Sequence, residues 1–328
     1  MNINEIMEDL IVIDGHTDIP RDIYLKEKNQ EQNVFMKNHY AQLKDSGIDM
    51  VFANIFTKGS LEDSLKEGLL QLEKIIKIPE ENKDVILIKN NKDIEHVLET
   101  KKLGLIISLE GFEPLYNQLE FLDIYYKLGL RAAMLTWNKR NQFACGIDEE
   151  TGGLTDLGKL AVKKMNDLGI LIDVSHLNEE GFWDVIEINK KPTIASHSNS
   201  RALFNHNRNL TDEQILAIAK SGGVIGVVSY FSKVDQEDLQ RIRYEDDNTE
   251  TIHDFIKQIE YMVNLIGYDH VAFGFDFNMY LGDFGVKGLE SSENTKDVIK
   301  LLLERGHKLE DIRKIAGENW IRVLRAII

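Results

Sequence analysis

Residues 10–20, LIVIDGHTDIP, join a short apolar run to a polar triplet. The run at residues 10–13 predicts a buried strand. Side chains two residues apart in an extended segment point to the same face, so His16 and Asp18 are expected to project together from the end of this strand. Imidazole and carboxylate groups suit zinc and similar divalent metals. Taken alone, the triplet fits a structural ion pair equally well.

Short apolar runs alternate with helical patterns along the whole chain. The expected strands cover residues 10–13, 50–56, 105–109, 132–135, 170–174, 193–195, 224–228 and 271–275. The clearest helical patterns cover residues 61–77, 157–168, 180–189, 212–221 and 254–266. Apolar strands separated by helices indicate a parallel sheet, and eight such units predict an α/β fold of the (β/α)8 TIM-barrel type. A doubly wound sheet is the alternative, but no G-x-G-x-x-G follows any expected strand.

The remaining pattern indicates one domain over residues 1–328. There is no Pro- or Gly-rich linker, no repeat of fixed period and no low-complexity tract. Residues 85–88 are expected to add a short strand outside the barrel. Residues 30–38 and 280–293 are expected to form long loops after the first and eighth strands.

Composition narrows the class of protein. The chain has 328 residues, 43% of them hydrophobic and 29% charged, as in globular proteins. Its formal charge of −16 disfavours binding to nucleic acid or to an anionic membrane. No apolar run approaches the roughly 20 residues of a membrane span, and no secretory signal precedes the first strand. Cys145 is the single cysteine, which is typical of a protein in the reducing cytoplasm. The composition leaves open whether the protein forms a homodimer.

The expected strand ends gather polar side chains at one rim. In a (β/α)8 barrel the active site lies at the carboxyl ends of the strands. The candidates there are His16, Asp18, Glu110, Trp137, Asn138, His176, His197 and Asp276. Three carboxylates brought together in a buried place need a counter-charge, which bound cations supply. One zinc uses three protein ligands plus water, so this set of ligands suits two metals.

The ordered motifs resemble one family. They are HTD (16–18), SLEG (108–111), DVSH (173–176), SHS (196–198), FGFDF (273–277) and GENWIRV (317–323). Their order resembles that of the membrane dipeptidase (renal dipeptidase) family of zinc peptidases, and the resemblance runs over nearly the whole chain, from Asp14 to Arg322. The resemblance implies an amidohydrolase-like, metal-dependent hydrolase barrel that acts on small peptides.

The resemblance also implies a ligand set, carried over motif by motif. His16 and Asp18 would hold one zinc ion, and His176 and His197 would hold the second. Glu110 would bridge the two ions. Two zinc ions that share a carboxylate can hold a bridging water and lower its pKa towards neutrality.

Two further residues acquire roles by matching motif. Arg208, in HNRNLTDEQ, would bind the free carboxylate of the substrate, and Asp276 would handle the proton. The expected reaction is hydrolysis of a dipeptide by the metal-bridging hydroxide, with Asp276 passing the proton to the leaving amine.

The chain departs from the family at the fourth strand. Its phrase LTWN places Trp137 where the mammalian enzymes carry a substrate-contacting histidine, with Asn138 beside it. Tryptophan cannot accept a hydrogen bond or carry charge, so stabilisation of the oxyanion by that route is in doubt. After FGFDF the chain continues with Asn278 where the family often has aspartate and glycine.

Two alternatives remain. Another binuclear amidohydrolase could cleave an N-acyl amino acid, a lactone or a phosphoester, although many such enzymes bridge their metals with a carboxylated lysine rather than a glutamate. A catalytically silent relative that binds peptide or metal is the second alternative, and loss of a ligand would favour it.

Overall fold

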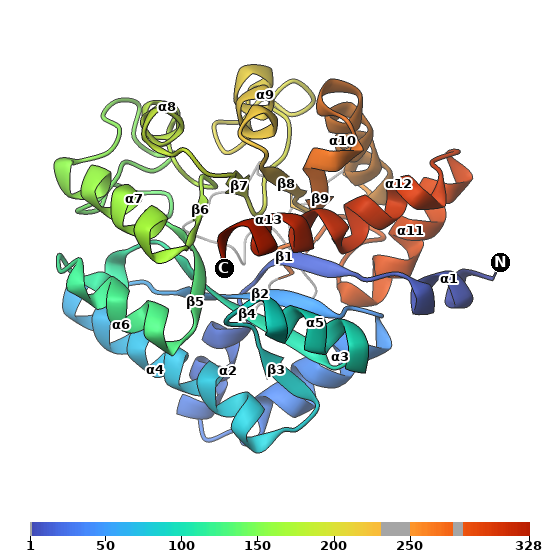
Figure 1. Cartoon of the computed structure of the whole chain (residues 1–328), viewed down its shortest axis with the longest axis horizontal. Coiled ribbons are helices and arrows are strands. Elements are labelled where there is room, and N and C mark those ends of the chain that lie inside the picture. The colour runs from blue at the N-terminus through green and yellow to red at the C-terminus, as the bar shows by residue number, and fades with distance from the viewer. Residues whose placement is uncertain (1, 231–249, 278–284) are drawn as a thin grey trace.

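The computed structural model describes residues 2–230, 250–277 and 285–328, and parallel strands form its centre (Figure 1). In order around the barrel these are β1 (Ile13–Thr17), β2 (Met50–Phe56), β4 (Leu103–Glu110), β5 (Leu130–Met134), β6 (Leu171–Asp173), β7 (Thr193–Ala195), β8 (Val224–Val227) and β9 (Val271–Phe273). Each pairs in parallel with the next. A bridge between Thr17 and Phe277 brings the end of the last strand back to the first. The predicted (β/α)8 barrel is confirmed.

Helices surround the barrel in Figure 1. They are α1 (Ile3–Asp9), α2 (Ile19–Lys28), α3 (Ala41–Asp45), α4 (Leu61–Glu81), α5 (Asn91–Thr100), α6 (Glu120–Leu128), α7 (Asp156–Leu168), α8 (Glu179–Ile188), α9 (Asp212–Lys220), α10 (Ile252–Ile266), α11 (Thr295–Glu304), α12 (Leu309–Arg313) and α13 (Asn319–Ile327). The hydroxyls of Thr155 and Thr211 cap the amino-terminal ends of α7 and α9. Within the described ranges, no helix is both long and apolar enough to cross a bilayer.

Two expectations about local structure change and one is confirmed. The first strand is Ile13–Thr17 rather than residues 10–13, because the N–H of Val12 donates to the Asp49 carboxylate (2.9 Å) and the ladder with β2 begins at Ile13. The extra strand is confirmed as β3 (Val85–Leu87), which pairs with β4. The expected loop at residues 30–38 runs into a π-helical turn, Phe35–Tyr40.

Several short helical turns lie between these elements within the described residues. The remaining helical turns are Glu113–Leu115, Tyr268–His270, Ser292–Asn294 and Lys314–Glu318. The last part of the expected loop at residues 280–293 therefore contains a 3-10 turn. Residues 280–284 of that loop lie outside the described residues.

An apolar layer and α13 fill the amino-terminal end of the barrel. Each barrel strand contributes to this cluster: Ile13, Met50, Phe52, Ile106, Ala132, Leu171, Ile194, Val224 and Ala272. Trp320 of α13 packs on Phe52 and donates from its indole N–H to the carbonyl of Phe273 (2.9 Å). Gly15 permits this approach, because a Cβ there would lie 2.5 Å from the Trp320 ring. With this end filled, only the carboxyl ends of the strands remain for a site.

Candidate active site

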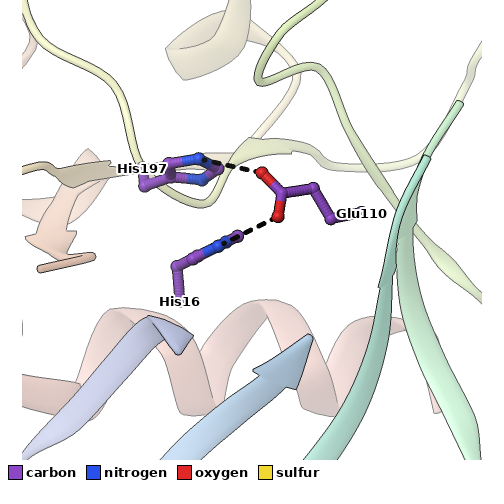
Figure 2. A group of neighbouring side chains, drawn as sticks. All are labelled: His16, Glu110 and His197. Atoms are coloured by element: carbon purple, nitrogen blue, oxygen red, sulfur yellow. Dashed lines mark ion pairs between the residues drawn. The ribbon is translucent and has the colours of Figure 1, made fainter. Parts of the chain in front are cut away.

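Glu110 lies at the centre of the polar cluster at the carboxyl end of β4 (Figure 2). Ile106 of the same strand is in the apolar layer, and the two-residue period of a strand brings Glu110 to the same inner face. One carboxylate oxygen lies 3.0 Å from Nε2 of His176 and 3.7 Å from Nε2 of His197. The other oxygen lies 3.5 Å from Nε2 of His16. The Glu110 carboxylate therefore lies between His16 on one side and the pair His176 and His197 on the other.

A bulge turns His16 towards the site. Ile13 faces the barrel interior, so strict alternation along β1 would send His16 outward. The register of β1 with β2 shifts between Asp14 and Thr17, and such bulges re-aim side chains next to active sites. Both ring nitrogens of His16 are buried, and neither has a hydrogen-bond partner. The sequence analysis expected His16 to reach the site by simple alternation, whereas in the structure the bulge directs it there.

Two aspartates, missed by sequence reasoning, hold the ligand-bearing strand ends together. One oxygen of Asp14 accepts the N–H groups of His16 (3.2 Å) and Phe275 (2.8 Å), which joins β1 to the segment after β9. One oxygen of Asp173 accepts the N–H groups of Ser175 and Ser196, both at 3.0 Å, which joins β6 to β7. We call these paired contacts the Asp14 clasp and the Asp173 clasp. Their sequence signal is an aspartate two or three residues before a strand-end histidine.

The histidines after β6 and β7 are held through Nδ1. Nδ1 of His176 lies 2.7 Å from the carboxamide oxygen of Asn138, and Nδ1 of His197 is hydrogen-bonded to the Ser196 hydroxyl (2.8 Å). Their Nε2 atoms lie 2.9 Å apart and face Glu110. The contact with His176 gives Asn138 an orienting role, while its expected substrate contact stays a prediction.

Asp18 and Asp276 complete the side of the site nearest β1. A carboxylate oxygen of Asp276 lies 3.5 Å from Nε2 of His16, and one of Asp18 lies 3.9 Å from it. His176 and Asp276 both have positive φ angles, 69° and 60°. Residues other than glycine seldom adopt this conformation, and it is concentrated at functional sites.

Burial dominates the electrostatics of the cluster. It raises the pKa of Glu110 and of Asp276 to about 8, and that of Asp18 to about 7. Burial also lowers the pKa of His176 and of His197 well below the ordinary histidine value, with nearby positive charge adding to the effect. The histidines are therefore neutral, as metal ligands must be. A bound cation would reverse the effect on the carboxylates, because it favours their charged form.

The cluster fits a pair of metals. Tetrahedral zinc holds nitrogen and oxygen ligands at about 2.0–2.2 Å, so neighbouring ligand atoms lie about 3.4 Å apart. The separations around Glu110 and His16 run from 3.0 to 3.9 Å. Ligand atoms lie within 4.8 Å of one another in two groups, His16 with Glu110 and His197, and His16 with Asp18 and Asp276. The unpartnered nitrogens of His16 and an unpartnered oxygen of Asp18 are buried, which a metal would satisfy.

Arg208 lies against the same cluster. Its guanidinium donates to the carbonyl of His197 (2.6 Å) and the hydroxyl of Ser198 (2.9 Å), and lies 3.2 Å from Nε2 of His176. Burial lowers its pKa to about 10, so it stays charged at neutral pH. Trp137 lies 6.1 Å from the His176 ring, measured between centroids. All nine site residues predicted from the sequence therefore lie in or beside one cluster.

Comparison with known proteins gives a consistent result. The model of the family described as "Membrane dipeptidase (Peptidase family M19)" matches residues 1–328. An uncharacterised protein from the pqqA 5′ region of Klebsiella pneumoniae is 35% identical over 247 residues, which cover 72% of this chain and 86% of that protein. Dipeptidase tcpJ of Claviceps purpurea is 27% identical over 278 residues, which cover 84% of this chain and 63% of that protein.

A solved structure supports the fold. A metallo peptidase from Rhodobacter sphaeroides, liganded with a phosphinate mimic of the dipeptide L-Ala-D-Ala, superposes with a TM-score of 0.87 at 23% identity. The match covers 97% of this chain and 99% of that one. With the whole-length family match, these findings confirm the resemblance seen in the sequence. The chain belongs to the membrane dipeptidase family, peptidase family M19, and is a metallo-dipeptidase.

Proposed function

We propose that the protein is a zinc-dependent dipeptidase that uses two zinc ions. The observation that carries the proposal is the position of Glu110, with one oxygen towards His176 and His197 and the other towards His16. That division suits a carboxylate that bridges two ions. His16 and Asp18 would hold one ion, while His176 and His197 would hold the second. When bound, the zinc pair supplies an activated water and polarises the scissile carbonyl.

The other site residues bind the substrate and move the proton. Arg208 pairs with the C-terminal carboxylate of the dipeptide, for which a fixed, charged guanidinium is suited. Asp276 accepts the proton of the attacking water and delivers it to the leaving amine, because its carboxylate faces the centre beside His16. Asn138 and Ser196 keep Nε2 of the two anchored histidines directed at the centre. Trp137 forms an apolar wall near the substrate, and a homodimer and a cytoplasmic location stay predictions.

Metal analysis combined with a dipeptide panel tests this function. Purified protein should contain about two zinc ions per chain. Chelation should abolish hydrolysis of dipeptides, and added zinc should restore it. N-acyl amino acids, lactones and phosphoesters belong in the same panel, because preferential hydrolysis of one of them would replace the dipeptidase proposal. Full activity in chelator with no bound metal would refute the metal centre.

A further inference from the structure

A lysine that the proposed mechanism does not use lies at the mouth of the barrel. Lys58 comes two residues after β2, and its side chain is exposed. Its ammonium nevertheless lies over two aromatic rings, 4.9 Å from the centroid of Trp137 and 5.5 Å from that of Phe56. A cation over an aromatic face is attracted by the electrons of the ring, so the two rings hold this charge at a defined place.

A second cation shares one of these rings. The guanidinium carbon of Arg21, in the first turn of α2, lies 5.2 Å from the centroid of Phe56, and the guanidinium donates to the Phe56 carbonyl (3.2 Å). An ion pair with Glu67 at 3.7 Å offsets part of its charge. Lys58 makes no ion pair within 4.0 Å in the described part of the chain, but it is close enough to the cluster for the charges of Asp18 and Glu110 to act on its ammonium. Two neighbouring like charges repel, so an anion placed beside Lys58 would be stabilised.

The position of Lys58 relative to Arg208 indicates which part of a bound dipeptide would lie near the ammonium. Three strands separate β2 from β7 in either direction around the eight-stranded barrel, so the two strands lie opposite each other. Lys58 follows β2, and Arg208 is bonded to residues directly after β7. The metal cluster around Glu110 lies between them. A dipeptide with its carboxylate at Arg208 and its scissile bond at the cluster therefore extends its N-terminal residue towards Lys58.

We propose that Lys58 binds an acidic side chain on the N-terminal residue of the substrate, and that dipeptides beginning with aspartate or glutamate are the preferred class. This inference rests on the proposed dipeptidase function. The ring of Trp137 holds the Lys58 ammonium by a cation–π contact, which would account for a tryptophan at this position. Arg21 adds positive charge behind Lys58 and strengthens attraction of the acidic side chain.

A pair of isosteric substrates tests the proposal on the zinc-loaded full chain. Glu-Ala and Gln-Ala have nearly the same shape and differ in charge, so the ratio of their kcat/KM values isolates the charge. The wild type should favour Glu-Ala by about fivefold, mainly through a lower KM, since exposed ion pairs are modest. Lys58→Gln should bring the ratio near one, and Lys58→Glu should reverse it. Lys300→Gln, on the outer helix α11, is the matched control and should keep the wild-type ratio.

Two other results would overturn the proposal. If Lys58→Gln lowers kcat/KM equally for both substrates, Lys58 acts on the shared backbone of the dipeptide and not on the side chain. If the wild-type ratio is near one, no acidic preference exists. Both results leave the dipeptidase function intact, whereas failure to hydrolyse any dipeptide would refute that function and this inference with it. The wild-type preference should also shrink as salt is raised, because the charges are exposed.

Discussion

The two halves of the cluster around Glu110 fix the backbone in the same way but hold their histidine rings differently. On the β1–β9 side the Asp14 clasp fixes the backbone of His16, and on the β6–β7 side the Asp173 clasp does the same before His176 and His197. The rings differ, however. His176 and His197 are anchored through Nδ1, whereas neither ring nitrogen of His16 has a hydrogen-bond partner within the described residues.

This difference indicates which half of the cluster is already arranged to bind a metal ion. Anchoring Nδ1 fixes the tautomer and the ring orientation, so the β6–β7 half presents Nε2 to an ion without rearrangement. The β1–β9 half instead gathers His16 with two carboxylates, Asp18 and Asp276, whose pKa values burial raises to about 7 and about 8, so protons must leave before these groups bind a cation in their charged form. We expect the β6–β7 ion to bind more tightly than the β1–β9 ion.

Loss of the bridge should have the largest effect, because Glu110 belongs to both halves. Glu110→Gln keeps the shape but removes the charge and one good ligand atom. We expect kcat/KM to fall by about 10⁴-fold or more, with zinc lost from both halves. Zinc content and dipeptide hydrolysis measured on one preparation check this. Retention of both ions with near-normal activity would contradict the bridging role.

Asp276→Asn separates proton transfer from metal binding on the β1–β9 side. The amide has nearly the same shape but cannot accept the proton at neutral pH. We expect kcat to fall by about 10²–10⁴-fold while KM changes little and both ions stay bound. The comparison to make is zinc content against kcat for one good dipeptide. Loss of zinc would make Asp276 a ligand, as its place 3.5 Å from His16 also allows.

The two clasps should act on separate ions. Asp173→Ala should weaken the tighter ion and Asp14→Ala the looser one, each by about 10–100-fold in affinity. Asn at either position keeps an oxygen acceptor and should recover part of the loss. Competition with a chromophoric chelator resolves the two affinities. Equal weakening of both ions by each alanine variant would show that the clasps support the whole barrel and not one half.

Much of this comparison could be predicted from the sequence. Strand ends in a (β/α)8 barrel meet at one rim, so apolar runs followed by His16, Glu110, His176, His197 and Asp276 were enough to predict a shared site. The strand bounds of β2 and β7 were also predicted to the residue. These features are local, or follow directly from topology.

Contacts between distant segments could not be predicted in this way. The hydrogen bonds that Asp14 and Asp173 accept depend on which backbone N–H group of a neighbouring segment lies beside each carboxylate. The bulge in β1 could not be predicted either, because strict alternation from Ile13 would direct His16 away from the site and only the register shift with β2 turns it inward. The sequence does not indicate that the Lys58 ammonium lies over the Trp137 ring, because this contact joins segments that are distant along the chain.

The smallest expected effect concerns stability and pH, and it also separates metal-free from metal-loaded protein. In the absence of metal, burial raises the pKa of Glu110 and Asp276 to about 8, from ordinary values of 4.5 and 3.8. These two carboxylates then bind protons more tightly in the folded state than in the unfolded state, so their contribution to stability falls as pH rises from about 4 towards 8. His176 and His197, whose pKa values are lowered in the folded state, contribute in the opposite direction below their ordinary pKa of 6.5. Zinc favours the charged carboxylates and should remove this fall. We expect the Tm of chelated protein to drop by about 5 °C between pH 6.5 and pH 8, above the ordinary histidine pKa, and that of zinc-loaded protein to change less. Calorimetry at both pH values provides the measurement, and Asp276→Asn, with one titrating carboxylate fewer, should show a shallower drop. A metal-free Tm that rises with pH would mean that these carboxylates are charged in the folded protein without any cation, and the electrostatic account of the β1–β9 half would then be wrong.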